Sequence, residues 1–445
     1  MAGRARESAR CPIMLTSAIF LVVLWASCVV SAQTQDAGAT SLTLDDAVTL
    51  AVRDNAELKA ARARWEAMQE RPRQVRTLPN PMFTYGGMDM ADRGRWPDTE
   101  EKRFMVEQEF PWFGKLPLRE GIAKKDAEAM QRDLEALIQD VILRVKETYF
   151  DLYAEQQSIR ITRQEEEVIG RIGRIAETMY ATGDRSQVDA IKAQTEVTML
   201  KQRLLEMLAQ ETTLKAKLNT LLNRRADTPL GEAVTPPQAM SIEDPNSLFA
   251  LAVSNRPEVQ ANQAQVERYE MEKRLMAKES VPDYRLGVEY RDFAHGDDMV
   301  MFTVGVELPL WRSKYRAATR EAEKMRAASQ AARQAAERQT SLDVQDASFR
   351  LMTARRTLEL YKAELIPQAQ ARFNASEAGY RTGKTDFMDL LESERFLLDA
   401  RIMAVTAEGN IGMQSARLER AVGRELKAGV PPAQPTAREG IEHGN

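Results

Sequence analysis

The chain repeats itself at an offset of about 200 residues. Three blocks recur in the same order, and the last of them keeps its Glu, Tyr, Thr, Gly and Asp positions. The matched blocks are 51–58 with 252–259, 106–115 with 304–314, and 177–189 with 377–389. Because three ordered matches indicate a duplication, the fold should consist of two copies of one structural unit.

Each half has the same predicted layout. A helical stretch comes first, at about 44–76 and 248–279, and prolines end it. A section with strand character follows, closed by a further proline and then by a very long helical stretch. A glycine, Gly183 or Gly383, interrupts that stretch before another long helix returns. The prolines are Pro79, Pro81 and Pro111 in the first half, and Pro282 and Pro309 in the second.

The stretch from Lys115 to Ala181 is predicted to be nearly continuous helix, roughly 100 Å long at 1.5 Å per residue. One apolar stripe runs along it, formed by Leu134, Leu137, Ile138, Val141, Val145 and Leu152. A helix of this length has to lie along other long helices, as in a coiled coil.

The strand sections alternate with period two and predict two hairpins, at about 82–110 and 284–308. Polar turns are expected at 92–95 and 294–298. Aromatic residues gather toward the proline ends of the strands, an arrangement typical of a bilayer-spanning barrel; the edge of a soluble β-sandwich is the alternative. Four strands cannot close a ring, and open edges do not occur in lipid. Membrane strands would therefore require an oligomer, and a trimer would supply twelve of them.

Residues 1–32 resemble a secretory signal, with Arg4, Arg6 and Arg10 before an apolar run and small residues before Gln33. A permanent single-pass anchor and lipidation of Cys28 are the alternatives. Cys11 and Cys28 are the only cysteines, so a chain cleaved after Ala32 can form neither disulfides nor cysteine metal sites.

Composition excludes several functional classes. Lys+Arg 62 against Asp+Glu 66 argues against a general nucleic-acid binder. A mean hydropathy of -0.45 with one long apolar run argues against a bundle of transmembrane helices. His295 and His443 are the only histidines, and no phosphate loop or catalytic triad accompanies them, so we expect no enzymatic activity and no cofactor.

The ordered, duplicated pattern over about residues 42–426 resembles the TolC family of outer-membrane efflux proteins. Three sequence motifs carry the resemblance: the run 42–47, the spaced set Tyr180, Gly183, Ser186 and Asp189, and the spaced set Tyr380, Gly383, Asp386 and Asp389. The resemblance implies a mainly α fold with membrane β-strands: a homotrimer with a long-helix α-barrel and a 12-stranded β-barrel, four strands per protomer. The family duct lies in the lipid of the outer membrane and docks on a periplasmic adaptor and an inner-membrane pump of the RND type.

The expected boundaries follow from the repeat and the resemblance. They are a signal peptide at 1–32, a first repeat at 33–228 with its turn near 183, a linker at 229–245, a second repeat at 246–426 with its turn near 383, and a polar disordered tail at 427–445.

The glycine turns have a structural explanation of their own. A left-handed glycine ends the incoming helix, and Ser186 or Asp386 then caps the outgoing one. Asp189 or Asp389, three residues further on, would complete a capping box. This alone is sufficient to explain the residues.

By resemblance, the same turns are the tips where the adaptor docks, through Gly183, Ser186, Gly383, Lys384 and Asp386. There the family closes its resting channel with bonds between helices and an acidic constriction. Asp189 with Tyr380 is the expected closing link, and Asp389 with Glu392 the expected constriction. Thr385 stands where an arginine partner is expected, with Lys384 beside it, so the network here should be rearranged.

The sequence gives little information about which cargo the duct would carry. Six methionines gather in or beside the hairpins: Met82, Met88, Met90, Met105, Met299 and Met301. Their thioethers suit Cu(I) or Ag(I), although lipid-facing or packing roles are the alternative. The runs 78–82 and 108–115 look like the branch that works with heavy-metal pumps of the Cus and Czc type. The resulting hypothesis is a passive, gated exit duct for heavy-metal ions; the alternatives are a duct for organic toxicants and a periplasmic coiled-coil adaptor without a barrel.

Overall fold

The computed structural model describes residues 42–90, 99–237, 245–294 and 296–426. The predicted signal segment with Cys28, the turn at 92–95, part of the linker, His295 and the tail with His443 lie outside the described residues.

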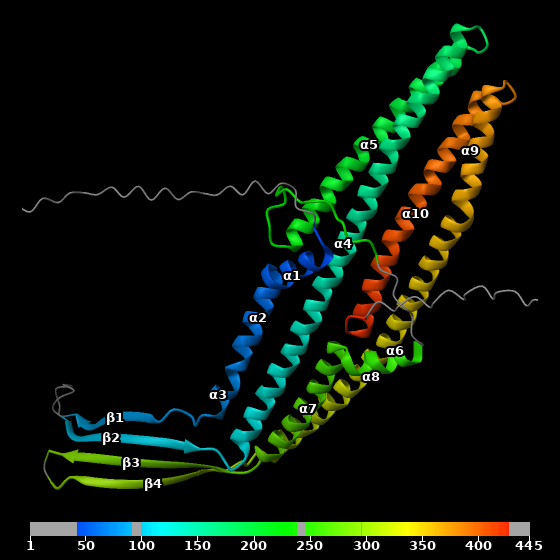
Figure 1. Ribbon diagram of the computed structural model, residues 1–445. Coiled ribbons are helices and arrows are strands. Elements are labelled where there is room, and N and C mark those ends of the chain that lie inside the picture. The colour runs from blue at the N-terminus through cyan, green and yellow to red at the C-terminus, as the bar shows by residue number, and fades with distance from the viewer. Residues whose placement is uncertain (1–41, 91–98, 238–244, 295, 427–445) are drawn as a thin grey trace, which may run out of the picture. The chain divides into compact units, whose positions relative to one another are not determined.

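The two repeats have matching elements in the same order (Figure 1). The first contains α1 (Leu44–Asp54), α2 (Ala56–Gln69), α3 (Arg71–Arg76), β1 (Met82–Met90), β2 (Thr99–Phe110), α4 (Lys115–Ala181) and α5 (Gln187–Leu221). The second contains α6 (Pro245–Asn255), α7 (Pro257–Lys278), β3 (Asp283–Phe293), β4 (Met299–Glu307), α8 (Arg312–Leu360), the π-helical segment η1 (Tyr361–Leu365), α9 (Ile366–Arg381) and α10 (Phe387–Val422). The predicted duplication, hairpins and long helices are confirmed.

Three helical stretches differ from the prediction. The stretch at 44–76 is interrupted at Asn55, whose side-chain oxygen accepts from the backbone N–H groups of Glu57 and Leu58 and so starts a new helix. The stretch at 248–279 is interrupted at Arg256, where α6 ends and α7 begins with Pro257. In the second repeat the long helix widens into η1 just before Pro367. Proline has no N–H to donate to the preceding turn, and the widened segment absorbs that loss.

All four strands form one antiparallel sheet in the order β1-β2-β3-β4, so β2 and β3 join the two repeats. Paired residues share a face of a sheet. The apolar face has two rows that cross all four strands: Phe83, Val106, Val288 and Phe302, and Tyr85, Phe104, Tyr290 and Val300. The charged face carries cross-strand ion pairs, among them Arg103 with Glu289 at 3.0 Å and Arg285 with Glu307 at 3.1 Å.

Helix α4 is the centre of the helical packing: it lies against α1, α2, α3, α5, α7 and α10. Its contact with α10 is close at Gly412, where an added Cβ would lie 2.5 Å from the ring of Phe150. Any larger residue there would require the Phe150 ring to move. Among the described residues, no helix is both long enough and apolar enough to cross a lipid bilayer.

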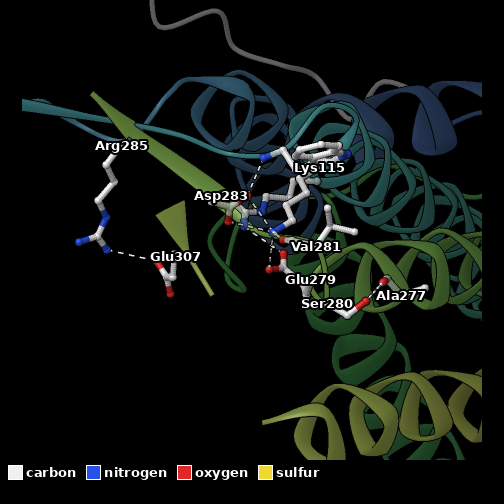
Figure 2. A network of polar contacts seen from close by, with 10 residues as sticks. Lys115, Ala277, Glu279, Ser280, Val281, Asp283, Arg285 and Glu307 are labelled. Carbon is white, nitrogen blue, oxygen red and sulfur yellow. Dashed lines mark hydrogen bonds and ion pairs between the residues drawn. The ribbon is translucent and has the colours of Figure 1, made fainter. Parts of the chain in front are cut away.

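The repeats are also tied together where helices change into strands (Figure 2). Lys115, at the start of α4, has a side chain only 1% exposed. Its ammonium donates to both carboxylate oxygens of Asp283, at 2.9 and 2.8 Å, and to the carbonyl of Val281 at 3.1 Å. It also lies 3.4 Å from Glu279. We call this set of four residues the junction network; three of its members belong to the second repeat.

Replacing Lys115 by Met should lower the free energy of unfolding by about 3–5 kcal/mol, because it takes the cation away from the half-buried carboxylate of Asp283. Glu279 keeps its ion pair with Arg119 at 3.1 Å. Thermal unfolding of the purified protein, followed by circular dichroism, measures the loss. The matched control is Lys314→Met, at the lysine that ends the corresponding block of the second repeat: Lys314 is exposed beside the ring of Tyr315. Equal effects of the two substitutions would contradict a special role for the junction network.

Candidate functional site: the paired helical turns

Two turns with the same geometry join the long helices. The first turn, 182–186, links α4 to α5, and the second turn, 382–386, links α9 to α10. Gly183 and Gly383 have φ of 82° and 77°, the left-handed conformation that glycine adopts without strain. In each turn the N–H after the glycine returns to the carbonyl five residues back: Asp184 to Met179 at 2.9 Å, and Lys384 to Gly379 at 2.8 Å. These bonds close the helix ends as the glycine positions predicted.

The outgoing helices begin with side-chain caps. Ser186 Oγ accepts from the N–H of Val188 at 3.2 Å, and Asp386 Oδ1 accepts from that of Phe387 at 2.6 Å. The predicted capping box is not completed by Asp189 within the described turn. Its carboxylate points to another helix, where it meets Tyr380.

Asp189 and Tyr380 join the two repeats. The Tyr380 hydroxyl donates to Asp189 Oδ2 at 3.3 Å, and both side chains are buried. Burial, together with the neighbouring Asp189 carboxylate, raises the pKa of Tyr380 to about 12, so the phenol remains a donor at physiological pH. The ring of Phe387 packs 5.3 Å away, edge-on to that of Tyr380.

Arg185 is the member of this site that sequence reasoning missed. Its guanidinium reaches from the first turn to the second and donates to the carbonyls of Tyr380 at 3.0 Å and Thr385 at 3.2 Å. It also lies over the Tyr380 ring, 4.7 Å from the centroid. Position 185 is the repeat equivalent of 385, so comparing the two turns residue by residue could have revealed an arginine on the opposite side.

The remaining predicted residues are on the surface of the turns. Asp389 and Glu392 are both exposed, and Glu392 pairs with Arg372 of α9 at 3.1 Å. The structure does not bring them into the Asp189–Tyr380 contact. The other predicted tip residues, Gly183, Ser186, Gly383, Lys384 and Asp386, are exposed as well.

Further charged contacts join the first-repeat helices to α10 beyond the turns. Glu196 of α5 is buried and accepts two bonds from the guanidinium of Arg395. Glu165 of α4 is buried as well, with Arg401 at 3.7 Å. Burial raises the pKa of Glu165 to about 7, and the Arg401 charge opposes that rise only in part.

The turns hold hydrogen-bonding and charged groups. Within the ranges that the structure describes, no three or more histidine, cysteine, aspartate or glutamate side chains are grouped so that they could hold a metal ion. The contacts that the turns make between helices are the hydrogen bonds of Arg185 and Tyr380.

Comparison with known proteins agrees with this architecture. The family described as "Outer membrane efflux protein" matches residues 47–224 and 248–424, one match in each repeat. The cobalt-zinc-cadmium resistance protein CzcC of Cupriavidus metallidurans is 25% identical over 387 residues, which cover 86% of this chain and 90% of that protein.

Solved channels share the fold. The outer membrane protein VceC of Vibrio cholerae superposes with a TM-score of 0.73 at 15% identity, over 86% of this chain and 97% of that one. The transmembrane channel CusC superposes with a TM-score of 0.74 at 14% identity, over 86% of this chain and 93% of that one. The resemblance to the TolC family is confirmed, and the chain belongs to the outer membrane efflux protein family.

Proposed function

We propose that this chain forms the outer-membrane exit duct of a tripartite efflux system that exports heavy-metal ions. The duct is a homotrimer that docks on a periplasmic adaptor and an inner-membrane pump of the RND type. One observation carries the proposal: a single sheet, apolar on one face and charged on the other, continues directly into long packed helices.

The sheet supports a trimer through its edges. Strands β1 and β4 are the outer strands of the sheet, and among the described residues each has no strand partner on its outer side. In lipid every backbone N–H and C=O group needs a partner, so β4 would pair with β1 of the next copy. Three copies make a closed ring of twelve strands. Its apolar face, with Phe302 and Val304 exposed, would meet lipid, and the ion pairs of the charged face would line the water-filled interior.

The relative CzcC supports heavy-metal ions as the cargo. The name of CzcC states resistance to cobalt, zinc and cadmium, and that protein covers most of this chain. Membership of an outer-membrane family favours the duct over a periplasmic adaptor. In a duct of this kind the pump does the energy-coupled work, and the chain supplies a sealed exit with a gate.

The gate rests on the contacts between the two turns. We call Arg185, Asp189, Tyr380 and Thr385 the latch. Three hydrogen bonds of the latch join the first turn and α5 to the end of α9 and the second turn. At roughly 1 kcal/mol net each, such bonds hold the tips together, yet they can be outweighed when an adaptor binds the exposed turns. Opening then means that the helical pairs move apart.

The duct and its cargo can be tested together in a strain that lacks the chain. Membranes that contain the restored protein, washed with urea and extracted with detergent, should yield a protein mass of three mature chains by light scattering. The strain should be sensitive to heavy-metal salts and recover with the restored chain, with organic dyes as the control toxicants. A monomer or dimer released by urea would contradict the duct, and sensitivity to dyes alone would contradict the cargo.

Opening the latch should raise channel conductance. Asp189→Ala combined with Tyr380→Phe removes one hydrogen bond, which favours the open state by about fivefold at roughly 1 kcal/mol. Single-channel recordings in planar bilayers measure the open fraction. The matched control is Tyr180→Phe: Tyr180 is the repeat equivalent of Tyr380 but is 47% exposed rather than 1%. An unchanged open fraction in the double variant would leave Asp189 and Tyr380 as packing residues.

The proposed constriction predicts a change in ion selectivity. In a trimer, Asp389 and Glu392 would repeat as a ring of negative charge that favours cations. Asp389→Asn with Glu392→Gln should therefore move the cation-to-anion permeability ratio, measured from reversal potentials, towards unity. Glu66→Gln with Glu70→Gln, two exposed positions at α2, provides the control. A ratio that stays at the unmodified value would place the constriction elsewhere.

A further inference from the structure

Methionine side chains gather on the charged face of the sheet. We call Met82, Met105, Met299 and Met301 the thioether set; Met88 and Met90 lie outside the residues whose side chains are described. In the register of the strands, Met105 is paired with Glu289, which is paired in turn with Met301. Met299 is paired with Arg291, and Met82 with Glu107. All four thioethers therefore lie on the face opposite Phe83, Val288 and Phe302.

This position is unexpected for packing or lipid-facing residues. Met82, Met299 and Met301 are 55%, 47% and 36% exposed, although an apolar face is available on the other side of the same strands. Several large apolar side chains exposed together among charges call for an explanation. The lipid-facing role that the sequence left open does not fit the register.

The thioether set forms a connected path across the sheet. Met82 of β1 and Met105 of β2 are diagonal neighbours on adjacent strands. Met105 and Met301 lie on either side of Glu289, about 10 Å apart at the usual spacing of strands. Two methionine side chains, each with three rotatable bonds, can close over that distance around one ion. Met299 continues the path along β4.

The charges around the thioether set neutralise one another. Glu289 accepts ion pairs from Arg103 at 3.0 Å and Arg291 at 2.5 Å, and Arg291 also lies 3.4 Å from Glu101. Hard divalent cations prefer free carboxylate oxygens, and here those oxygens face arginines. Uncharged thioether sulfur instead suits soft monovalent ions. A face of this kind favours soft monovalent ions over hard divalent cations.

We propose that the thioether set is a series of weak binding sites for soft monovalent metal ions, Cu(I) or Ag(I), on the charged face of the sheet. The proposal rests on the proposed function, in which this face lines the exit duct, and it adds soft monovalent ions to the cobalt, zinc and cadmium that the name of the relative CzcC suggests. Several weak sites in sequence let an ion enter and leave, as conduction requires.

The test uses the detergent-extracted full chain titrated with silver nitrate in chloride-free buffer. The variant carries Met82→Leu, Met105→Leu, Met299→Leu and Met301→Leu, which keeps apolar volume but removes sulfur. The matched control carries the same change at four exposed methionines of the helices, Met199, Met325, Met388 and Met403. Calorimetry should show apparent Ag(I) affinity about tenfold or more lower in the sheet variant and unchanged in the helix variant. Methyl NMR signals of the thioether set should shift with Ag(I) and not with Zn(II).

The possible results separate this proposal from the duct itself. Equal Ag(I) affinity in the unmodified protein and the sheet variant would overturn the metal sites, and so would equal losses in the two variants. Potassium conductance, recorded on the same samples, reports the duct independently. Reduced Ag(I) affinity with normal potassium conductance supports the proposal. Unchanged Ag(I) affinity with normal conductance overturns the metal sites alone. Absence of conductance even in the variant with Asp189→Ala and Tyr380→Phe, which opens the latch, overturns the proposed function.

Discussion

The buried ammonium of Lys115 holds the two repeats together at the level where helices give way to strands. Lys115 opens α4 in the first repeat, whereas Glu279, Val281 and Asp283 all belong to the second. Because an unpaired charge at this depth costs several kcal/mol, the two junctions must stay in contact. That constraint aligns the base of the sheet with the ends of the helices. It allows β2 to pair with β3 while α4 packs against α7.

Duplication supplied the scaffold, and divergence between the copies supplied the site. The two turns have nearly the same backbone, with left-handed glycines and capped helices in both. Their side chains differ: Tyr380 is buried where Tyr180 is exposed, and an arginine at 185 faces a threonine at 385. A hydrogen bond between the two repeats needs a donor in one repeat and an acceptor in the other. At the turns, the two repeats keep the same backbone and differ in the side chains that meet.

Local signals in the sequence predicted most of the elements. Prolines, period-two alternation and glycine spacing were sufficient for the hairpins, for α4 and for both turns, because each depends on a few neighbouring residues. The break at Asn55 was missed although its cap, to Glu57 and Leu58, is local. The bond from the same side chain to the carbonyl of Leu221 is a contact that only the folded chain provides. Two further contacts are also long-range. One is the pairing of β2 with β3, which joins the hairpins, and the other is the bonding of Arg185 to the second turn. Resemblance to a family, and not local pattern, suggested that Asp189 and Tyr380 would meet.

The π-helical segment η1 has a consequence for the direction in which α9 presents its side chains. A widened turn places one additional residue in the helix, which advances the helical phase by about 100° relative to an uninterrupted α-helix. This offset changes the direction around the helix axis in which every later side chain points, including that of Tyr380 near the far end of α9. The rotational setting that points this phenol at Asp189 is thus fixed well before the turn itself, by the backbone around Pro367.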